Sequence, residues 1–246
     1  MTAHSSEAAT SPFCARLDGV SKLFGSFAAL RQVSVDFEAG HCYVVIGENG
    51  AGKSTLLRIL AGLLRPSFGT VKVFGELEPN EARARIGYMS HASMLYDELT
   101  AEENLRYFSS LYPDRQRGGR ACLKPAEALR QVGLDPDLNR VIGQYSQGMR
   151  QRTSLARVLL SVPELLLLDE PFSNMDIESA RQMVELLAGF RQGNRTIILT
   201  THQREMAAPI ADWVLALHAG RVASFEPGSP ATGLRRWGGE PGNPTL

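Results

Sequence analysis

Residues 45 to 60 read Val-Ile-Gly-Glu-Asn-Gly-Ala-Gly-Lys-Ser-Thr-Leu-Leu-Arg-Ile-Leu. Within them, Gly47 to Ser54 fit the pattern G-x-x-x-x-G-K-[S/T], with an apolar strand (Tyr43 to Ile46) before them and a helix with an apolar face after them. Glycine N–H groups can converge there on phosphate oxygens that a Cβ would obstruct. The helix that begins near Gly52 adds the positive end of its dipole. The pattern therefore predicts a nucleotide phosphate site.

The two residues that close the pattern carry their own chemistry. Lys53 would place a cation on the terminal phosphates, and the hydroxyl of Ser54 would hold Mg²⁺. A glycine-rich turn between a strand and a helix is the alternative interpretation. The strand and the helix on the correct sides favour the nucleotide site. A nucleotide site alone does not tell what the protein does with the nucleotide, so the function must be inferred from the rest of the chain.

Composition excludes several classes of protein. Of 246 residues, 26 are Lys or Arg and 26 are Asp or Glu, so no net charge points to nucleic acid or an anionic membrane as the main partner. Three scattered cysteines fit a reducing compartment, and no apolar run reaches the roughly 20 residues of a membrane span. Residues 1–12 lack the features of a signal peptide. We expect a cytoplasmic protein that acts at a membrane only through partners.

The pattern along the chain divides it into a sheet-forming frame and a helical insertion. Residues 1–12 and 227–246 are expected to be disordered tails, because small and turn-forming residues dominate them. Helical periodicity from Ala101 to Val132, broken by a solvated basic loop (Arg115, Arg117, Gly118, Gly119, Arg120), places an insertion at about 92–150. Helices are also expected up to about Leu64, from Ser146 to about Leu160, and over Glu178 to Phe190. Strands are predicted at 15–20, 33–37, 43–46, 70–74, 85–89, 165–168, 196–200, 213–217 and 221–225. Continuous apolar strands alternating with helices indicate a parallel sheet that is covered on both faces.

Two acids follow the most apolar of these strands, Leu165 to Leu168. Acids at the carboxyl edge of a parallel sheet lie where ligands bind in such folds. Asp169 is the candidate for holding Mg²⁺ through water, and Glu170, expected on the opposite side of the strand end, could polarise a water in line with the terminal phosphate. Two solvated acids at a strand end are the alternative interpretation.

A second helix start lies at Tyr145-Ser146-Gln147-Gly148-Met149. Ser146 is a plausible N-cap, and Gly148 permits close backbone approach. A simple capped helix is the alternative. Taken with the first site, this segment predicts a second phosphate-binding terminus, which a single nucleotide in one chain would not need. Two chains that share two nucleotides would need both.

With these motifs in order, the chain over about residues 14–226 resembles the ATP-binding subunits of ABC transporters. Its Walker A motif is Gly47 to Thr55, and its Walker B motif with the following glutamate is Leu165 to Glu170. Tyr145 to Met149 stands at the ABC signature, and Ser173-Asn174-Met175-Asp176 at the D-loop. The resemblance implies an α/β P-loop NTPase over residues 13–226, with a RecA-like core, an antiparallel β subdomain and the inserted helical subdomain.

The resemblance also implies the site and its partners. Two subunits would pair head to tail around two ATP molecules, so that Ser146 and Gly148 of one complete the site of the other. Glu170, His202 and His91 would be catalytic, and Ser54 and Asp169 would hold Mg²⁺. The residues implied to contact ATP are Phe24 (against adenine), Gly47, Glu48, Asn49, Gly50, Ala51, Gly52, Lys53, Ser54, Thr55, Ser146, Gly148 and Asp176. The other partners would be integral membrane permease subunits that hold the protein to the inner face of the membrane, without nucleic acid.

Some positions depart from the family pattern. The signature carries Gln147 and Met149, the D-loop carries Asn174 and Met175, and His91 stands where the family usually has glutamine. The neutral imidazole of His91 can ligate Mg²⁺ or hold a water. The alternative is that His91 only fills space in this segment. The segment from His91 to Leu105, read together with the signature, is most similar to the ATP-binding subunit of the cytochrome c maturation haem exporter. That resemblance implies no direct haem ligation by this subunit.

Three functional hypotheses follow. The first is the ATPase of an exporter, with haem export and cytochrome c biogenesis as the subfamily. The second is the ATPase of a drug, lipid or polysaccharide exporter. The third, a soluble ABC ATPase outside transport, lacks support because the chain has neither long coiled coils nor tandem ATPase domains. The apolar residues after His91 (Met94, Leu95 and Tyr96) are expected to line a groove for a short helix of the membrane partner.

Overall fold

The structure is a computed structural model that describes residues 13–76, 82–111, 122–192 and 195–228. The basic loop with Arg115, Arg117 and Arg120, and the expected tails at 1–12 and 229–246, lie outside the described residues. The second tail was expected from residue 227, but Pro227 is the last residue of a strand. Across the described ranges, no helix is both long and apolar enough to cross a lipid bilayer.

The central sheet contains, among the described residues, six strands in the order β5-β6-β7-β3-β8-β9. Their bounds are β3 Cys42–Ile46, β5 Ile86–Met89, β6 Leu165–Asp169, β7 Thr196–Thr200, β8 Trp213–His218 and β9 Arg221–Pro227. The first five in this order pair in parallel, as predicted, whereas β9 pairs antiparallel with β8. The reversal follows from Ala219 and Gly220, whose φ angles of 47° and 79° make the two-residue turn of a hairpin.

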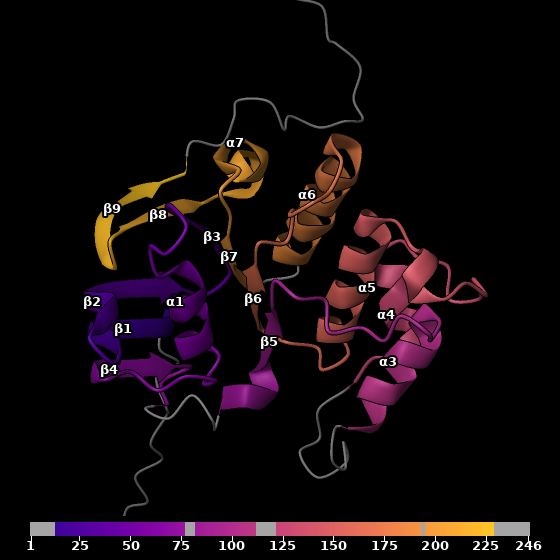
Figure 1. The fold of residues 1–246 in the computed structure, drawn as a ribbon, viewed down its shortest axis with the longest axis horizontal. Coiled ribbons are helices and arrows are strands. Elements are labelled where there is room, and N and C mark those ends of the chain that lie inside the picture. The colour runs from indigo at the N-terminus through magenta and orange to yellow at the C-terminus, as the bar shows by residue number, and fades with distance from the viewer. Residues whose placement is uncertain (1–12, 77–81, 112–121, 193–194, 229–246) are drawn as a thin grey trace, which may run out of the picture.

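A second sheet of three described strands lies beside the first in the order β2-β1-β4 and is antiparallel (Figure 1). Its strands are β1 Phe13–Phe24, β2 Phe27–Glu38 and β4 Phe68–Val73. β1 and β2 are longer than the predicted 15–20 and 33–37 because they continue into a hairpin whose outer residues do not alternate between apolar and polar, although Ala29 and Leu30 within it are buried. This extension matters because it carries Phe24 at its tip, next to Gly25.

The helices are α1 Lys53–Leu60, α3 Ala101–Ser110, α4 Pro125–Gln131, α5 Gln147–Leu159, α6 Ile177–Gln192 and α7 Arg204–Ala207, with short 3₁₀ turns at Arg83–Arg85, Ile142–Gln144 and Ala208–Ile210. α1 stops at Leu60 rather than near Leu64 because Gly62, with a φ of 67°, leaves the helical region. α3 and α4 pack against α5, so the helical layer expected over 92–150 continues to Leu159 (Figure 1).

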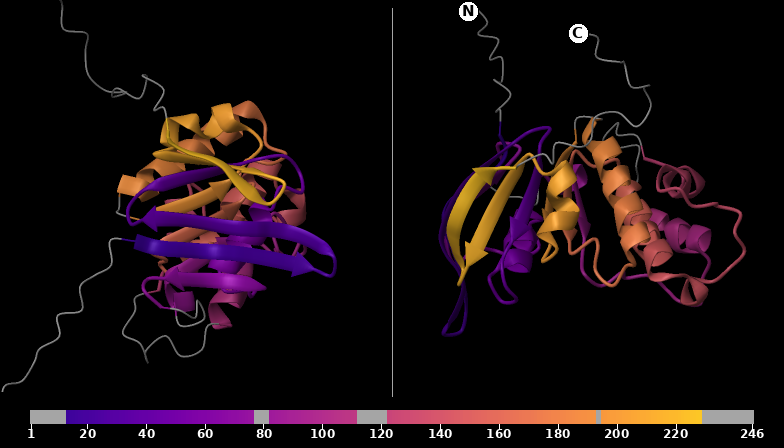
Figure 2. Two further views of the ribbon diagram at one scale, coloured as in Figure 1. Left: turned by 90° about the vertical axis from the view of Figure 1, so that its left-hand side faces the viewer. Right: turned by 90° about the horizontal axis from the view of Figure 1, so that it is seen from above.

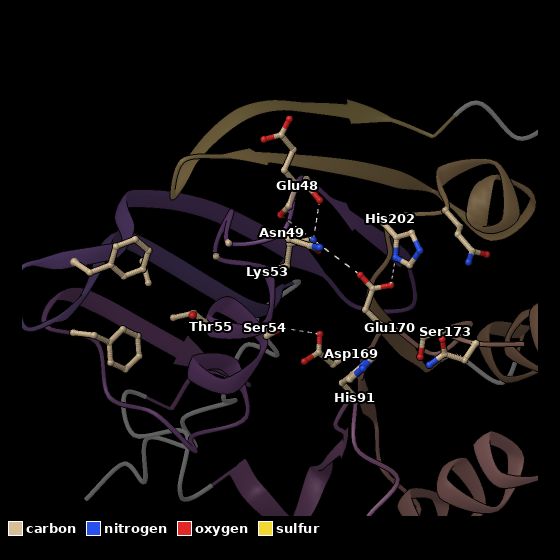
Figure 3. A pocket seen from close by; sticks show the side chains of 18 of the residues that line it. Glu48, Asn49, Lys53, Ser54, Thr55, His91, Asp169, Glu170, Ser173 and His202 are labelled. Carbon is tan, nitrogen blue, oxygen red and sulfur yellow. Dashed lines mark hydrogen bonds and ion pairs between the residues drawn. The ribbon is translucent and has the colours of Figure 1, made fainter. Parts of the chain in front are cut away.

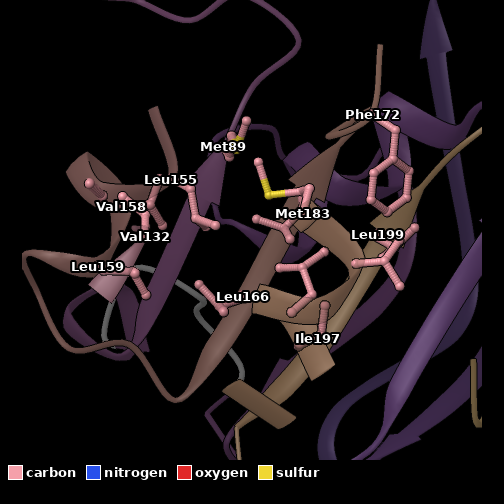
Figure 4. Packing of buried hydrophobic residues seen from close by; sticks show 14 of the residues in the cluster. Met89, Val132, Leu155, Val158, Leu159, Leu166, Phe172, Met183, Ile197 and Leu199 are labelled. Atoms are coloured by element: carbon pink, nitrogen blue, oxygen red, sulfur yellow. The ribbon is translucent and has the colours of Figure 1, made fainter. Parts of the chain in front are cut away.

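Side chains of the central sheet alternate between two apolar cores, as buried strands require. On β6, Leu165 and Leu167 face α1 and the antiparallel sheet, whereas Leu166 and Leu168 face α5 and α6. Figure 2 shows the two layers on either side of the central strands, and Figure 4 shows the helix-side core, where Leu155, Met183 and Leu166 converge. The sheet is thus covered on both faces, and its free carboxyl edge is left for the site.

Candidate functional site

A cavity of about 990 Å³ opens at the carboxyl ends of β3, β6 and β7, between them and the hairpin tip (Figure 3). Strand, loop and helix contribute to it together, because parallel strands present all their carboxyl ends at one edge. The residues that line it are Phe24, Phe27, Ala29, Gly47, Glu48, Asn49, Gly50, Gly52, Lys53, Ser54, Thr55, His91, Asp169, Glu170, Ser173, Asn174, Met175, His202 and Gln203. Thirteen of the predicted site residues are therefore gathered in one place.

The loop between β3 and α1 forms a cradle that only glycine can build. Gly50 and Gly52 have φ angles of 83° and 104°, which side-chain-bearing residues rarely adopt. A Cβ on Gly47 would collide with the carbonyl oxygen of Leu217, and one on Gly52 would lie 2.5 Å from that of Ala29. Gly52 is also the N-cap of α1 and has no side chain to occupy the N–H groups of the first turn. The cradle therefore fits a phosphate chain.

Lys53 is the first residue of α1 and is almost fully buried. Its Nζ donates to the carbonyl oxygens of Gly47 (2.8 Å) and Glu48 (3.2 Å), so the ammonium group lies along the loop. Glu170 Oε1 lies 4.0 Å from the same Nζ. The cation is thus held between the cradle and the acid that follows β6, where terminal phosphates would need it.

Asp169 ends β6 and is 2% exposed. Its Oδ1 accepts hydrogen bonds from Ser54 Oγ (3.0 Å) and from Thr200 Oγ1 (2.7 Å). Within the described ranges, no three His, Cys, Asp or Glu side chains gather closely enough to hold a metal ion by themselves. Ser54 and Asp169 are hard oxygen donors that suit Mg²⁺ when substrate phosphates supply further oxygens. The residues present therefore fit this ion.

Glu170 lies outside the strand and in a strained conformation, with a φ of 54°. Its N–H donates to Thr200 Oγ1 (3.0 Å), and His202 Nδ1 lies 2.9 Å from its Oε2. Glu170 was expected on the side of the strand end opposite to Asp169, but both acids line the same cavity (Figure 3). Strand alternation fails here because β6 ends at Asp169 and the backbone turns at the next residue.

Sequence reasoning missed Thr200 and Phe27. Thr200 is fully buried and joins the two acids through one hydroxyl, donating to Asp169 and accepting from Glu170. Phe27 shares the cavity wall with Phe24, and the two side chains are 59% and 49% exposed. An aromatic three residues after Phe24, across a Gly-Ser turn, was the available signal for Phe27. Thr200 had none, because threonine is common in strands.

Four predicted residues do not line the cavity, as far as the described residues define it: Ala51, Ser146, Gly148 and Asp176. Ala51 is buried in the turn, where its N–H donates to Glu48. Ser146 caps α5 by accepting from Met149 N–H (3.2 Å). Asp176 precedes α6, and the backbone N–H and hydroxyl of Ser179 hold the pKa of its carboxyl below the ordinary value. Their contact with ATP stays a prediction.

Fold and cavity together define a P-loop nucleotide-hydrolysing domain. The family model described as "ABC transporter" matches residues 30–173, more than half of the chain. The chain belongs to the ABC transporter family, as an ATP-binding and ATP-hydrolysing subunit. This confirms the predicted fold class and the resemblance at family level.

Curated relatives and a solved structure agree with the family. The ABC transporter ATP-binding protein NatA of Bacillus subtilis is 36% identical over 198 residues, covering 79% of this chain and 80% of the relative. The Nod factor export ATP-binding protein I of Rhizobium johnstonii is 36% identical over 214 residues, covering 86% and 68%. A dimeric ATP-binding cassette in a post-hydrolysis state, bound to ADP and Pi, superposes with a TM-score of 0.75 at 25% identity, covering 87% of this chain and 98% of that one.

Proposed function

We propose that this chain hydrolyses ATP in a head-to-tail dimer of two copies and thereby drives export through separate membrane subunits. The single observation that supports this best is the division of the motifs between two places. The cradle, both acids and His202 line one cavity, whereas Ser146 and Gly148, the second phosphate-binding terminus, lie outside it. A second copy would supply what the cavity lacks. The dimeric assembly of the related cassette bound to ADP and Pi is consistent with this arrangement.

The residues of the cavity divide the work of hydrolysis by their positions. The glycine cradle and Lys53 bind the phosphate chain, and the exposed rings of Phe24 and Phe27 offer a surface for stacking the base. Ser54 and Asp169 would hold Mg²⁺, which neutralises charge on the phosphates. We assign to Asn49 and Thr55 lesser phosphate contacts.

Glu170 is the group that orients and deprotonates the attacking water. His202 contacts Glu170 Oε2 on one side, and Lys53 lies near Oε1 on the other, so both oxygens have fixed neighbours. His91 lines the cavity at the edge nearest the helical layer and is assigned a water-holding role. A carboxylate held in this way can accept a proton in one defined direction.

The permease would dock beside His91. Met94 and Tyr96 are 61% and 45% exposed, and Tyr107 of α3 packs edge-on against Tyr96 at 5.1 Å between ring centroids. Leu95, expected in the same groove, instead packs partly buried against the helix-side core. The exposed surface is thus apolar but narrower than the sequence indicated, and a short amphipathic helix suits it. Such docking would place the protein at the inner face of the membrane.

The cargo is proposed at the level of class. The Nod factor export relative is consistent with an exporter of a drug, lipid or polysaccharide. Haem export, with a role in cytochrome c biogenesis, rests on the sequence likeness around His91 and the signature, and neither relative named above mentions haem. We therefore place the general exporter hypothesis first.

The substitution Glu170→Gln tests the catalytic assignment. It removes the base but leaves the cradle, Lys53 and Asp169, so we expect ATP to bind normally while turnover falls by about 10²–10⁴-fold, the range for loss of a general base. The variant should form an ATP-dependent dimer that is stable in gel filtration, because the contacts released by hydrolysis persist. Steady-state phosphate release and size analysis with and without ATP measure both effects. Hydrolysis at the native rate would contradict the role given to Glu170.

A further inference from the structure

One face of the signature helix α5 packs against the D-loop and α6. Gly148, Gln151 and Arg152 stand at i, i+3 and i+4 and so share that face. Gln151 Nε2 donates to Ser173 Oγ at 3.4 Å, and Arg152 donates to Gln182 Oε1. Gly148 is buried at the top of this contact, opposite the first turn of α6. The signature and the D-loop therefore meet within one chain.

Gly148 has no room for a side chain. A Cβ there would lie 2.7 Å from Ser179 Oγ and 2.8 Å from Ser179 Cβ, closer than real carbon atoms approach, and 3.6 Å from Met175 Cε. Gly189, in the last turn of α6, is the contrast, because a Cβ there meets none of the described atoms within 4 Å. The requirement for glycine at 148 thus arises from packing inside the chain.

Ser179 cannot move aside freely, because Asp176 holds it twice. The N–H of Ser179 donates to Asp176 Oδ1 (2.8 Å), and its hydroxyl donates to Asp176 Oδ2 (2.7 Å). A larger residue at 148 would push Ser179, and with it the last residue of the D-loop. The same serine therefore touches the signature on one side and holds the D-loop carboxylate on the other.

We propose that Ser179 is a positioning residue that sets the spacing between the signature and the D-loop, and that Gly148 is required chiefly by its contact with Ser179. The inference rests on the proposed function, in which both segments act on the nucleotide of a second copy. The N–H groups at the start of α5 have no acceptor within the helix, so their direction depends on how α5 packs against α6. Ser179 determines that packing distance.

A reciprocal rescue tests the proposal. Gly148→Ala should lower ATPase activity and ATP-dependent dimerisation by at least about tenfold, as overpacking by one methyl group does. Ser179→Gly removes both colliding atoms and loses one hydrogen bond, so alone it should cost about threefold. The double variant should return to the level of Ser179→Gly. Gly148→Ala with Ser179→Ala keeps the Cβ collision and should stay as low as Gly148→Ala.

Dimerisation is measured in the Glu170→Gln background, and ATP affinity of the monomer serves as a readout that packing at 148 should not move. The matched control is Gly189→Ala, which adds the same methyl group to a helix in open space and should leave activity at the native level. No rescue by Ser179→Gly would overturn the proposal. Native dimerisation in every folded variant would also overturn the proposal, because Ser179 would then affect stability without positioning the signature.

Urea unfolding without ATP separates this proposal from the proposed function. The losses from Gly148→Ala and Ser179→Gly should be strongly non-additive, since the two residues touch. Additive losses would overturn the contact whatever the activities are. If unfolding shows the coupling but Glu170→Gln neither binds ATP nor dimerises, the proposed function fails while the packing contact stands.

Discussion

Two helices of this chain begin at segments that the sequence marks for phosphate, and they begin in opposite ways. α1 is capped by Gly52, in the left-handed region with a φ of 104° and with no side chain to occupy the N–H groups. α5 is capped by Ser146, whose hydroxyl already accepts from Met149 N–H. The first terminus faces the cavity of its own chain, and the second lies outside that cavity.

The difference distinguishes a helix start that binds phosphate within its own chain from one that would be supplied to the site of a second chain. An uncapped helix start leaves its N–H groups free to donate to a ligand. The unpaired N–H groups lower stability, and a bound ligand restores it by accepting their hydrogen bonds. A self-capped start is stable alone and offers its remaining donors only to something that approaches from outside. Composite sites need one terminus of each kind, and this chain has both.

Among changes at the two helix starts, the largest effect should come from Lys53→Ala, which removes the cation from the site at the start of α1. We expect ATPase activity to fall by about 10²–10³-fold, as for other losses of a fixed electrostatic contact, with the fold intact. Steady-state phosphate release measures this fall in activity, and binding of a fluorescent ATP analogue to the monomer measures the lost phosphate contact. Because Lys53 lies between the cradle and Glu170, equal binding by variant and native protein would mean that the cradle alone defines the site.

The next largest effect should come from substituting Gly52, the N-cap of α1, because its backbone conformation requires glycine. Gly52→Ala forces a strained φ and puts a Cβ 2.5 Å from the carbonyl oxygen of Ala29, so we expect a loss of about 2–4 kcal/mol in the free energy of unfolding. Gly50→Ala has the strained φ but meets nothing within 4 Å among the described atoms, and about 1 kcal/mol should be lost. Urea titration of both variants gives the comparison. Equal losses would show that strain, and not collision, dominates.

The self-capped start of α5 should show a smaller effect on stability than the collision at Gly52. Ser146→Ala removes the cap and should lower the free energy of unfolding by about 1 kcal/mol. Ser146→Asp keeps a good cap but adds a negative charge, so stability should be retained while ATP-dependent dimerisation is lost. ATP binding by the monomer should be native in both. If Ser146→Asp dimerises normally, the α5 terminus does not meet the second nucleotide.

Much of the fold could be predicted because apolar runs and glycines carry strong local signals. The buried strands from Leu165 to Leu168 and from Thr196 to Thr200 lie within one residue of their predicted ends. The length of the hairpin that carries Phe24 was underestimated, because its outer residues do not alternate between apolar and polar in the sequence. The direction of β9 depends on the turn at Ala219 and Gly220, which the pattern of strands alone does not contain.

The site was predicted where one motif supplies several residues and missed where a single side chain bridges distant segments. Gly47 to Thr55 are local, and the cradle follows from their spacing. Thr200 is 30 residues from Glu170 and meets it only because β6 and β7 lie side by side. The predicted side for Glu170 was wrong for a related reason, since the strand ends one residue before it.

The hydroxyl of Thr200 makes correct strand pairing a condition of activity. β6 and β7 pair in parallel with Asp169 opposite Thr200, and a slip of one residue would put Leu199 or Thr201 there. Leu199 could not hold either acid, and in that register Thr200 would present its hydroxyl on the other face of the sheet. A chain paired with Leu199 at this position would therefore be inert rather than partly active. That folding error would remove ATP turnover without leaving an uncontrolled hydrolase behind.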